Sequence, residues 1–141
     1  MRKTKRQMMG ISKILMIILS LAILSAWQMN DAQDGNWVAP SSANQLKNPL
    51  NGDEAATKAG AVLYKQMCAI CHGDKGKGDG MAGMSLNPRP SNFTKSAIQE
   101  QTDGAIFWKL TTGRSPMAGY EKILKENQRW QLVNYIRTFK K

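Results

Sequence analysis

Apolar residues follow a helical period in the stretch from about Glu54 to Ile70. Their positions are Ala59, Val62, Leu63, Met67 and Ile70. One face of an α-helix returns about every 3.6 residues, so this spacing predicts a helix over residues 54–70. Asp53 stands directly before it, where a carboxylate can cap the first backbone amides of a helix.

Two more helices are expected in the second half of the chain. The first starts at Thr102 or Asp103 and stops at Gly113. The second, from about Glu126 to Phe139, is amphipathic but starts after a poorly capping lysine. No stretch alternates convincingly between apolar and polar residues, as a strand would. The pattern therefore predicts an all-α domain.

The N-terminal region differs from the rest, because residues 14–27 (ILMIILSLAILSAW) carry no charge and follow a basic start. A positive segment before an apolar one marks export. The run is short for a membrane span, which needs about 20 residues, but its flanks can extend it. No good cleavage site follows. Residues 1–29 are therefore expected to form an uncleaved signal-anchor, with a removed signal peptide as the alternative.

The positive-inside rule places the chain after this helix outside the cytoplasm in either case. We expect anchoring in the cytoplasmic membrane with the rest on the periplasmic side, or a cleaved protein soluble in the periplasm. Residues 30–52 are rich in Pro, Ser and Asn and read as an extended tether. Trp37 and Val38 could pack on the domain, but a solvated linker is the expected state. Residues 53–141 form the folded domain.

The charge pattern narrows the class of partner. Five of the 20 Lys and Arg residues precede the apolar run, which leaves 15 against 10 acidic residues. A modest positive surplus suits docking on an acidic protein, where it speeds encounter. No basic run is interleaved with aromatic residues, so a nucleic-acid partner is not expected.

The two cysteines and the single histidine fall together as Cys68, Cys71 and His72. A C-x-x-C-H sequence is the attachment site of a c-type haem. Its thiols bond covalently to the porphyrin and its imidazole binds the iron. A dithiol redox motif would need a thioredoxin-like context, a structural zinc site would need four ligands, and a disulfide across two residues would stabilise little. We expect one covalent haem c, with Cys68, Cys71 and His72 holding it.

The iron's second axial ligand has to be another residue type, because the chain has one histidine. Met117 lies in a proline-stiffened loop (GRSPMAGY) between the last two helices and is the expected ligand, with Met84 as the runner-up. A methionine thioether favours reduced iron and raises the potential. No nucleophile–base pair is apparent, so the chain is expected to transfer electrons and not to be an enzyme.

Residues from about 53 to 141 resemble the class I cytochrome c family. The segments that carry this resemblance are CHGDKGKGDG, NPRPSNFT, SPMAGY and RWQLVNYIRTF, with Gly60 and Tyr64 before them. The resemblance implies about three main helices around one buried haem. It also implies that the first and last helices cross near Gly60, with Tyr64 packed on Trp130 or Tyr135. The carbonyl of Pro88 is the implied acceptor of a hydrogen bond from the histidine ligand.

The function expected from these observations is one-electron transfer to and from redox partner proteins, expected to be membrane-bound respiratory complexes. Two arrangements stay open: a membrane-tethered electron shuttle, or the cytochrome c subunit of a larger membrane-bound respiratory oxidoreductase. A five-coordinate haem that senses a ligand or reacts with peroxide is a third reading, and it requires that Met117 not bind the iron.

Overall fold

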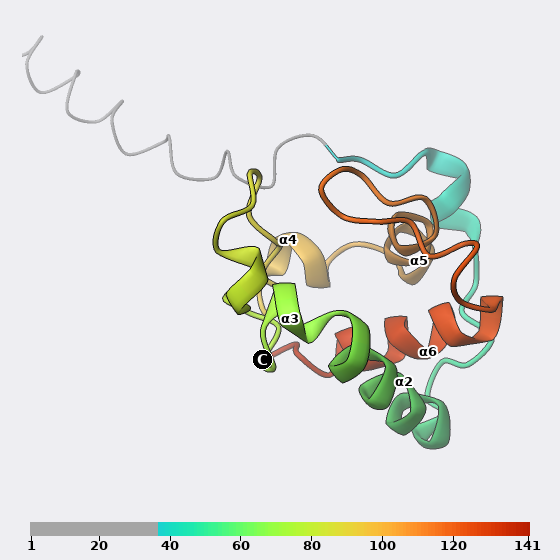
Figure 1. The fold of residues 1–141 in the computed structure, drawn as a ribbon. Helices are drawn as coiled ribbons and strands as arrows, with labels where there is room; N and C mark the ends of the chain where they lie inside the picture. Colours follow the sequence, from blue (N-terminus) through green and yellow to red (C-terminus); the bar gives the residue numbers. More distant parts are fainter. Residues whose placement is uncertain (1–36) are drawn as a thin grey trace, which may run out of the picture. The chain divides into compact units, whose positions relative to one another are not determined.

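The computed structural model describes residues 37–141, and all regular structure within them is helical (Figure 1). The elements are η3 (Ser41–Gln45), α2 (Glu54–Met67), α3 (Ala69–His72), η4 (Met81–Gly83), α4 (Ser96–Gln99), α5 (Asp103–Thr112) and α6 (Glu126–Arg137). Residues 37–141 contain no strand, only an isolated bridge between Arg114 and Met117. The expected all-α domain with three main helices is confirmed: these are α2, α5 and α6.

The ends of the helices follow from their capping residues. The side chain of Asp53 accepts the amide of Ala56 at 2.9 Å and starts α2 as predicted. Thr102 caps α5 in the same way, and Gly113 ends it with a φ of 66°, a value that favours glycine. Lys125 offers α6 no side-chain acceptor. Instead its own backbone amide donates to the Gln128 side chain at 2.9 Å.

The predicted helix over residues 54–70 is two helices, because the chain bends at Cys68. This residue has φ −115° and lies between the end of α2 and the start of α3. The bend turns the attachment sequence away from the axis of α2, so that α3 forms a separate turn.

Helices α2 and α6 pack against each other (Figure 1). They cross at Gly60, as expected from the resemblance. A Cβ at Gly60 would overlap the backbone carbonyl of Gln131, so only glycine allows this approach. Tyr64 then meets Tyr135, with ring centroids 5.1 Å apart. Of the two neighbours expected for Tyr64, Tyr135 is confirmed. The ring of Trp130 instead stacks on Phe107 of α5 at 3.9 Å.

One apolar core joins the three main helices. Its largest fully buried side chains are Tyr64, Leu132, Val133 and Ile136. Arg137 closes the end of α6 against α5 through an ion pair with Asp103 at 2.7 Å, and also donates to the Gln99 carbonyl at 2.9 Å. The guanidinium therefore joins α4, α5 and α6 at one corner of the core.

The segment of residues 37–50, which we call the strap, packs along α5. Ala39 and Ala43 are buried, at 8% and 2% exposure. A Cβ at Gly104 of α5 would overlap the Ala43 carbonyl, so the glycine lets the two backbones touch. The expectation of a solvated linker is wrong for these residues. The segment has few apolar residues, but its small alanines allow it to pack closely against α5.

Polar side chains fix the strap as well. The amide of Asn48 donates to Asp103 at 2.9 Å and to the side chain of Asn134 at 2.7 Å. Thr102 donates to the side chain of Asn44 at 2.9 Å. The strap thus contacts α5 and α6 through hydrogen bonds between side chains far apart in the sequence.

The expected signal-anchor of residues 1–29 and the start of the tether lie outside the described residues. Among residues 37–141, no helix combines the length and the apolar character needed to cross a membrane.

Candidate functional site

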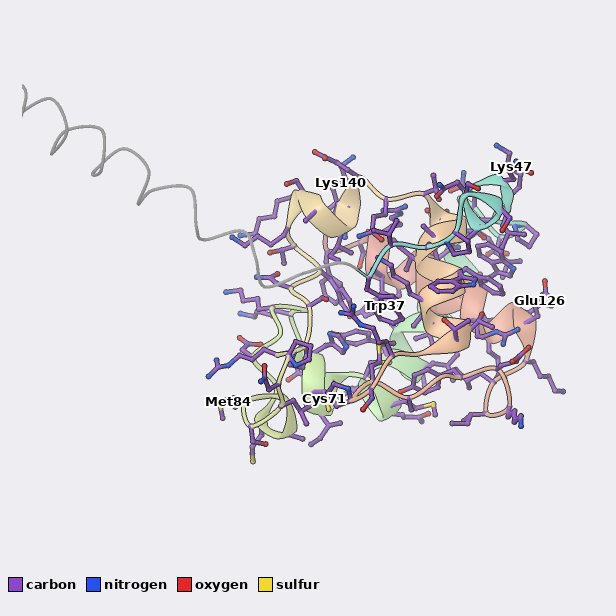
Figure 2. All side chains as sticks on the ribbon, turned by 90° about the horizontal axis from the view of Figure 1, so that it is seen from above. Trp37, Lys47, Cys71, Met84, Glu126 and Lys140 are labelled. Carbon is purple, nitrogen blue, oxygen red and sulfur yellow. The ribbon has the colours of Figure 1, made fainter. Side chains whose placement is uncertain are left out.

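The three residues of the attachment sequence lie on one helical turn. The backbone amide of Cys68 donates to Tyr64 at 2.8 Å, and that of His72 donates to Cys68 at 2.8 Å. Cys68 is buried and Cys71 is half-buried, and both are free thiols. Figure 2 labels Cys71. The fold therefore offers two unbonded sulfurs beside one imidazole.

The ring of His72 is held in one orientation. Its Nδ1 lies 3.1 Å from the backbone carbonyl oxygen of Ser91. A carbonyl can only accept, so Nδ1 carries the proton and Nε2 keeps a free lone pair. The ring of Phe93 stacks on the imidazole at 4.4 Å with planes 16° apart. Together these contacts fix both the tautomer and the plane of the ring.

Burial also sets the charge of His72. The side chain is 9% exposed, and this loss of hydration lowers the pKa of the imidazole, with the Ser91 hydrogen bond acting in the opposite direction. The ring is therefore neutral at pH 7. A neutral imidazole with one protonated and one free nitrogen is the form that binds a metal.

The expected acceptor Pro88 is wrong, and Ser91 takes its place. The backbone amide of Phe93 donates to Gly76 at 2.6 Å, and Gly78 lies against the carbonyl of Pro90. These contacts fix the register of residues 90–93 on the glycine-rich loop. That register brings the Ser91 carbonyl to the imidazole.

The glycine-rich loop folds back on α3. The backbone amide of Gly78 donates to the His72 carbonyl at 2.8 Å, and that of Gly80 donates to Cys71 at 3.1 Å. The hydroxyl of Tyr64, from the middle of the core, donates to the Gly73 carbonyl at 2.7 Å. The attachment turn is thus tied to the glycine-rich loop at Cys71 and His72, and to the core through Tyr64.

The residues after α5, 113–125, form what we call the methionine loop. Within it Arg114 and Met117 exchange two backbone hydrogen bonds, of 3.0 and 2.8 Å. The backbone amide of Tyr120 donates to Leu110 at 2.9 Å and returns the loop to α5. Met117 is partly buried against the core cluster that contains Cys68.

Met84, the other candidate for the second axial ligand, lies in a different environment. Met84 is 54% exposed and follows the short helix η4, at the margin of the face seen in Figure 2. Met81, three residues earlier at the start of η4, is 79% exposed. Of the methionines in the two loops, Met117 alone packs on the core that holds an attachment cysteine.

The cysteines do not have the character of a dithiol redox pair. Burial, together with the neighbouring Cys71, raises the pKa of the Cys68 thiol to about 12. Dithiol catalysts instead need a lowered pKa, because the thiolate is the nucleophile. Two unbonded thiols beside a neutral imidazole are, by contrast, the donor set that a haem with two thioether bonds and one axial nitrogen would take. The residues present therefore fit a c-type haem.

A family model described as "Cytochrome C oxidase, cbb3-type, subunit III" matches residues 55–136. The chain belongs to this family. It is a class I c-type cytochrome, with a covalently bound haem c whose iron transfers electrons. The matched residues run from the start of α2 to the end of α6, so the family assignment covers all three main helices.

A solved structure is also similar to this cytochrome. It is the reducing HAO-like protein complex of Kuenenia stuttgartiensis, in which one chain matches with 26% identity and a TM-score of 0.58. The match covers 79% of this chain and 55% of that chain, so this cytochrome spans little more than half of its length. No curated protein matches.

Two residues of the site were not found from the sequence. Phe93 and Ser91 both lie in the NPRPSNFT stretch, which carried the resemblance but no assigned contact beyond Pro88. The sequence feature that could have indicated this contact is Phe93, the one aromatic residue in a polar, proline-rich segment. An aromatic side chain in such a segment needs a packing partner, and in the fold that partner is the imidazole of the attachment turn.

Proposed function

We propose that this cytochrome is a one-electron carrier in which Cys68 and Cys71 form the haem thioethers and His72 and Met117 are the axial iron ligands. The observation that carries the proposal is the state of His72. Its Nδ1 donates to Ser91, which leaves Nε2 as the one nitrogen available to a metal.

The residues around the site would keep the iron's surroundings unchanged during electron transfer. Haem iron supplies a reversible one-electron change between ferric and ferrous states. Ser91 holds the proton at Nδ1 and Phe93 holds the plane of the ring, so His72 keeps its orientation in both states. The Met117 thioether favours the reduced iron and supports a high potential. Two axial ligands from the chain, one of them held in a fixed orientation, would suit outer-sphere transfer and leave no open position for a substrate.

The place of action follows from the N-terminal sequence. Residues 14–27 are proposed to anchor the chain in the cytoplasmic membrane, with the haem domain on the periplasmic side; removal of this helix, giving a soluble periplasmic protein, is the alternative. An anchor raises the effective concentration of the domain near membrane-bound respiratory partners. The positive surplus after the anchor favours partners with an acidic docking surface.

A second arrangement is supported by the family description, which names an oxidase subunit. In it the chain is the cytochrome c subunit of a larger membrane-bound oxidoreductase and relays electrons within that complex. Native electrophoresis of mildly solubilised membranes with haem staining separates the two. A small haem-stained band supports the shuttle, whereas co-migration with a large complex supports the subunit.

Redox titration of the purified full chain, followed in the visible spectrum, tests the electron-carrier function itself. We expect a single one-electron Nernstian transition for one haem per chain, together with the near-infrared charge-transfer band of oxidised methionine-ligated haem. A chain that binds carbon monoxide readily when reduced, and that lacks this band when oxidised, would instead have the five-coordinate iron of a ligand-sensing or peroxidatic haem.

A further inference from the structure

Trp37, the first described residue of the strap, lies among three side chains from α5 and its end. The indole ring is 6.4 Å from the ring of Trp108. The Lys109 ammonium lies 5.6 Å from the centroid of the Trp37 ring, and the Arg114 guanidinium lies 5.1 Å from it. Trp37 is near the middle of the face seen in Figure 2. Two cations therefore face one aromatic ring.

Arg114 links this contact to the methionine loop. It is the first residue after Gly113, which ends α5, and its backbone exchanges two hydrogen bonds with Met117. A guanidinium over an indole face is held in position by the charge distribution of the ring. Trp37 therefore holds the residue that closes the turn in which Met117 stands.

The strap is itself held firmly enough to support such a contact. Ala43, six residues after Trp37, is 2% exposed, and Asn48 bonds to both α5 and α6. Trp37 is thus fixed from its C-terminal side by packing that does not involve the methionine loop.

We propose that Trp37 is a positioning residue for the methionine loop: through Arg114 it keeps the Met117 turn closed over the iron. This inference rests on the proposed axial role of Met117. In this arrangement the strap does more than precede the three main helices: it also restrains the dissociation of Met117 from the iron.

Binding of imidazole to the oxidised, full-length holoprotein tests this role. Imidazole reaches the iron only when Met117 has left it, so its apparent affinity reports the fraction of molecules with an open loop. Replacing Trp37→Leu keeps an apolar side chain and removes the aromatic face. We expect imidazole to bind about three- to tenfold more tightly to this variant, as loss of one or two cation–π contacts predicts.

Two further variants separate positioning from general packing. Val38→Ala is the matched control, since Val38 is the neighbouring residue and is 79% exposed; its imidazole affinity should equal that of the unmodified protein. Trp37→Phe keeps a ring and should fall between the two. Arg114→Gln should raise imidazole affinity as well, and combining it with Trp37→Leu should add little, because both changes remove the same contact between Trp37 and Arg114.

The outcomes distinguish this inference from the proposed function. The inference is supported if the methionine charge-transfer band is lost at the lowest imidazole concentration in Trp37→Leu, at an intermediate one in Trp37→Phe, and at the highest in Val38→Ala and the unmodified protein. Equal imidazole affinity of Trp37→Leu and Val38→Ala, with the band present in both, overturns the inference and leaves the function standing. Absence of the band from the unmodified oxidised protein would contradict Met117 ligation and the inference together.

Discussion

The two sides of the haem site are built in different ways. On the side of His72, the attachment turn, the glycine-rich loop and residues 90–93 are joined by backbone hydrogen bonds, and the imidazole is 9% exposed. On the side of Met117, the loop has two short internal turns, at residues 114–117 and 120–124, and two return bonds to α5, from Tyr120 to Leu110 and from Glu121 to Thr111. Met117 itself is only partly buried.

The difference shows where rigidity is needed. His72 has one proton to place and one lone pair to present, and a shifted ring would change both. A thioether has no tautomer and several rotatable bonds, so a methionine ligand can be partly buried and needs less exact support from its loop. The comparison predicts that changes on the histidine side affect folding, whereas changes on the methionine side affect the ligand and the potential.

The largest effect is expected from removing both attachment residues, Cys68→Ala with Cys71→Ala. About 90 residues make a marginal core without a haem, and covalent attachment is what keeps the haem in place. We expect no haem and no cooperative helical fold, by visible absorption and far-UV circular dichroism. Recovery of a stable, native-like helical apoprotein would contradict this.

The next largest effect is expected at Phe93, which stacks on His72 and is 9% exposed. Phe93→Ala should lower the free energy of unfolding by about 3–5 kcal/mol, as for other buried phenylalanines. Guanidinium unfolding of the holoprotein measures it. Ile123→Ala in the methionine loop is the control; this side chain is 57% exposed, and a cost within about 0.5 kcal/mol is expected. Similar costs at the two positions would remove the contrast between the sides.

Met117→Ala should lower the free energy of unfolding by about 1–2 kcal/mol, less than Phe93→Ala, because the side chain is only half-buried. Its effect on the ligation of the iron should be large. The near-infrared band should disappear and the reduction potential should fall. Met84→Ala is the matched control, being 54% exposed, and should change neither. Loss of the band in Met84→Ala, with its retention in Met117→Ala, would exchange the two assignments.

The smallest effect is expected from pH. Because burial lowers the pKa of His72 below 6.5 in the folded chain, the unfolded chain binds a proton first as pH falls. Stability should therefore be fully present above pH 6.5 and decline below it, by at most about 1.4 kcal/mol per pH unit. Iron bound to Nε2 acts in the same direction. Guanidinium midpoints between pH 7.5 and 5 measure this, and a midpoint that rises toward pH 5 would contradict it.

Features that depend on short stretches of sequence were predicted well. The caps at Thr102 and Gly113 gave α5 its bounds, whereas the crossing at Gly60 was expected only from the family resemblance. The grouping of Cys68 with His72 follows from their spacing. The caps and the attachment sequence are each decided by residues a few positions apart.

Features that depend on the register of separate segments were predicted less well. Choosing between Pro88 and Ser91 required knowing how residues 90–93 lie on the glycine-rich loop. The strap was read as a linker because its partner, Gly104, lies more than 50 residues later. Composition indicates that a segment lacks a core of its own, but not that it can complete another.

The central claim is that Cys68 and Cys71 bond covalently to a haem whose iron His72 binds. Mass spectrometry of the purified chain after acid–acetone extraction, with fragmentation of the peptide that contains Cys68, tests it most directly. We predict that the pigment stays with the polypeptide and that the mass of one haem is found on the fragment spanning Cys68 to His72. Pigment that passes into the acetone, or a fragment with the mass of its amino acids alone, would contradict the claim.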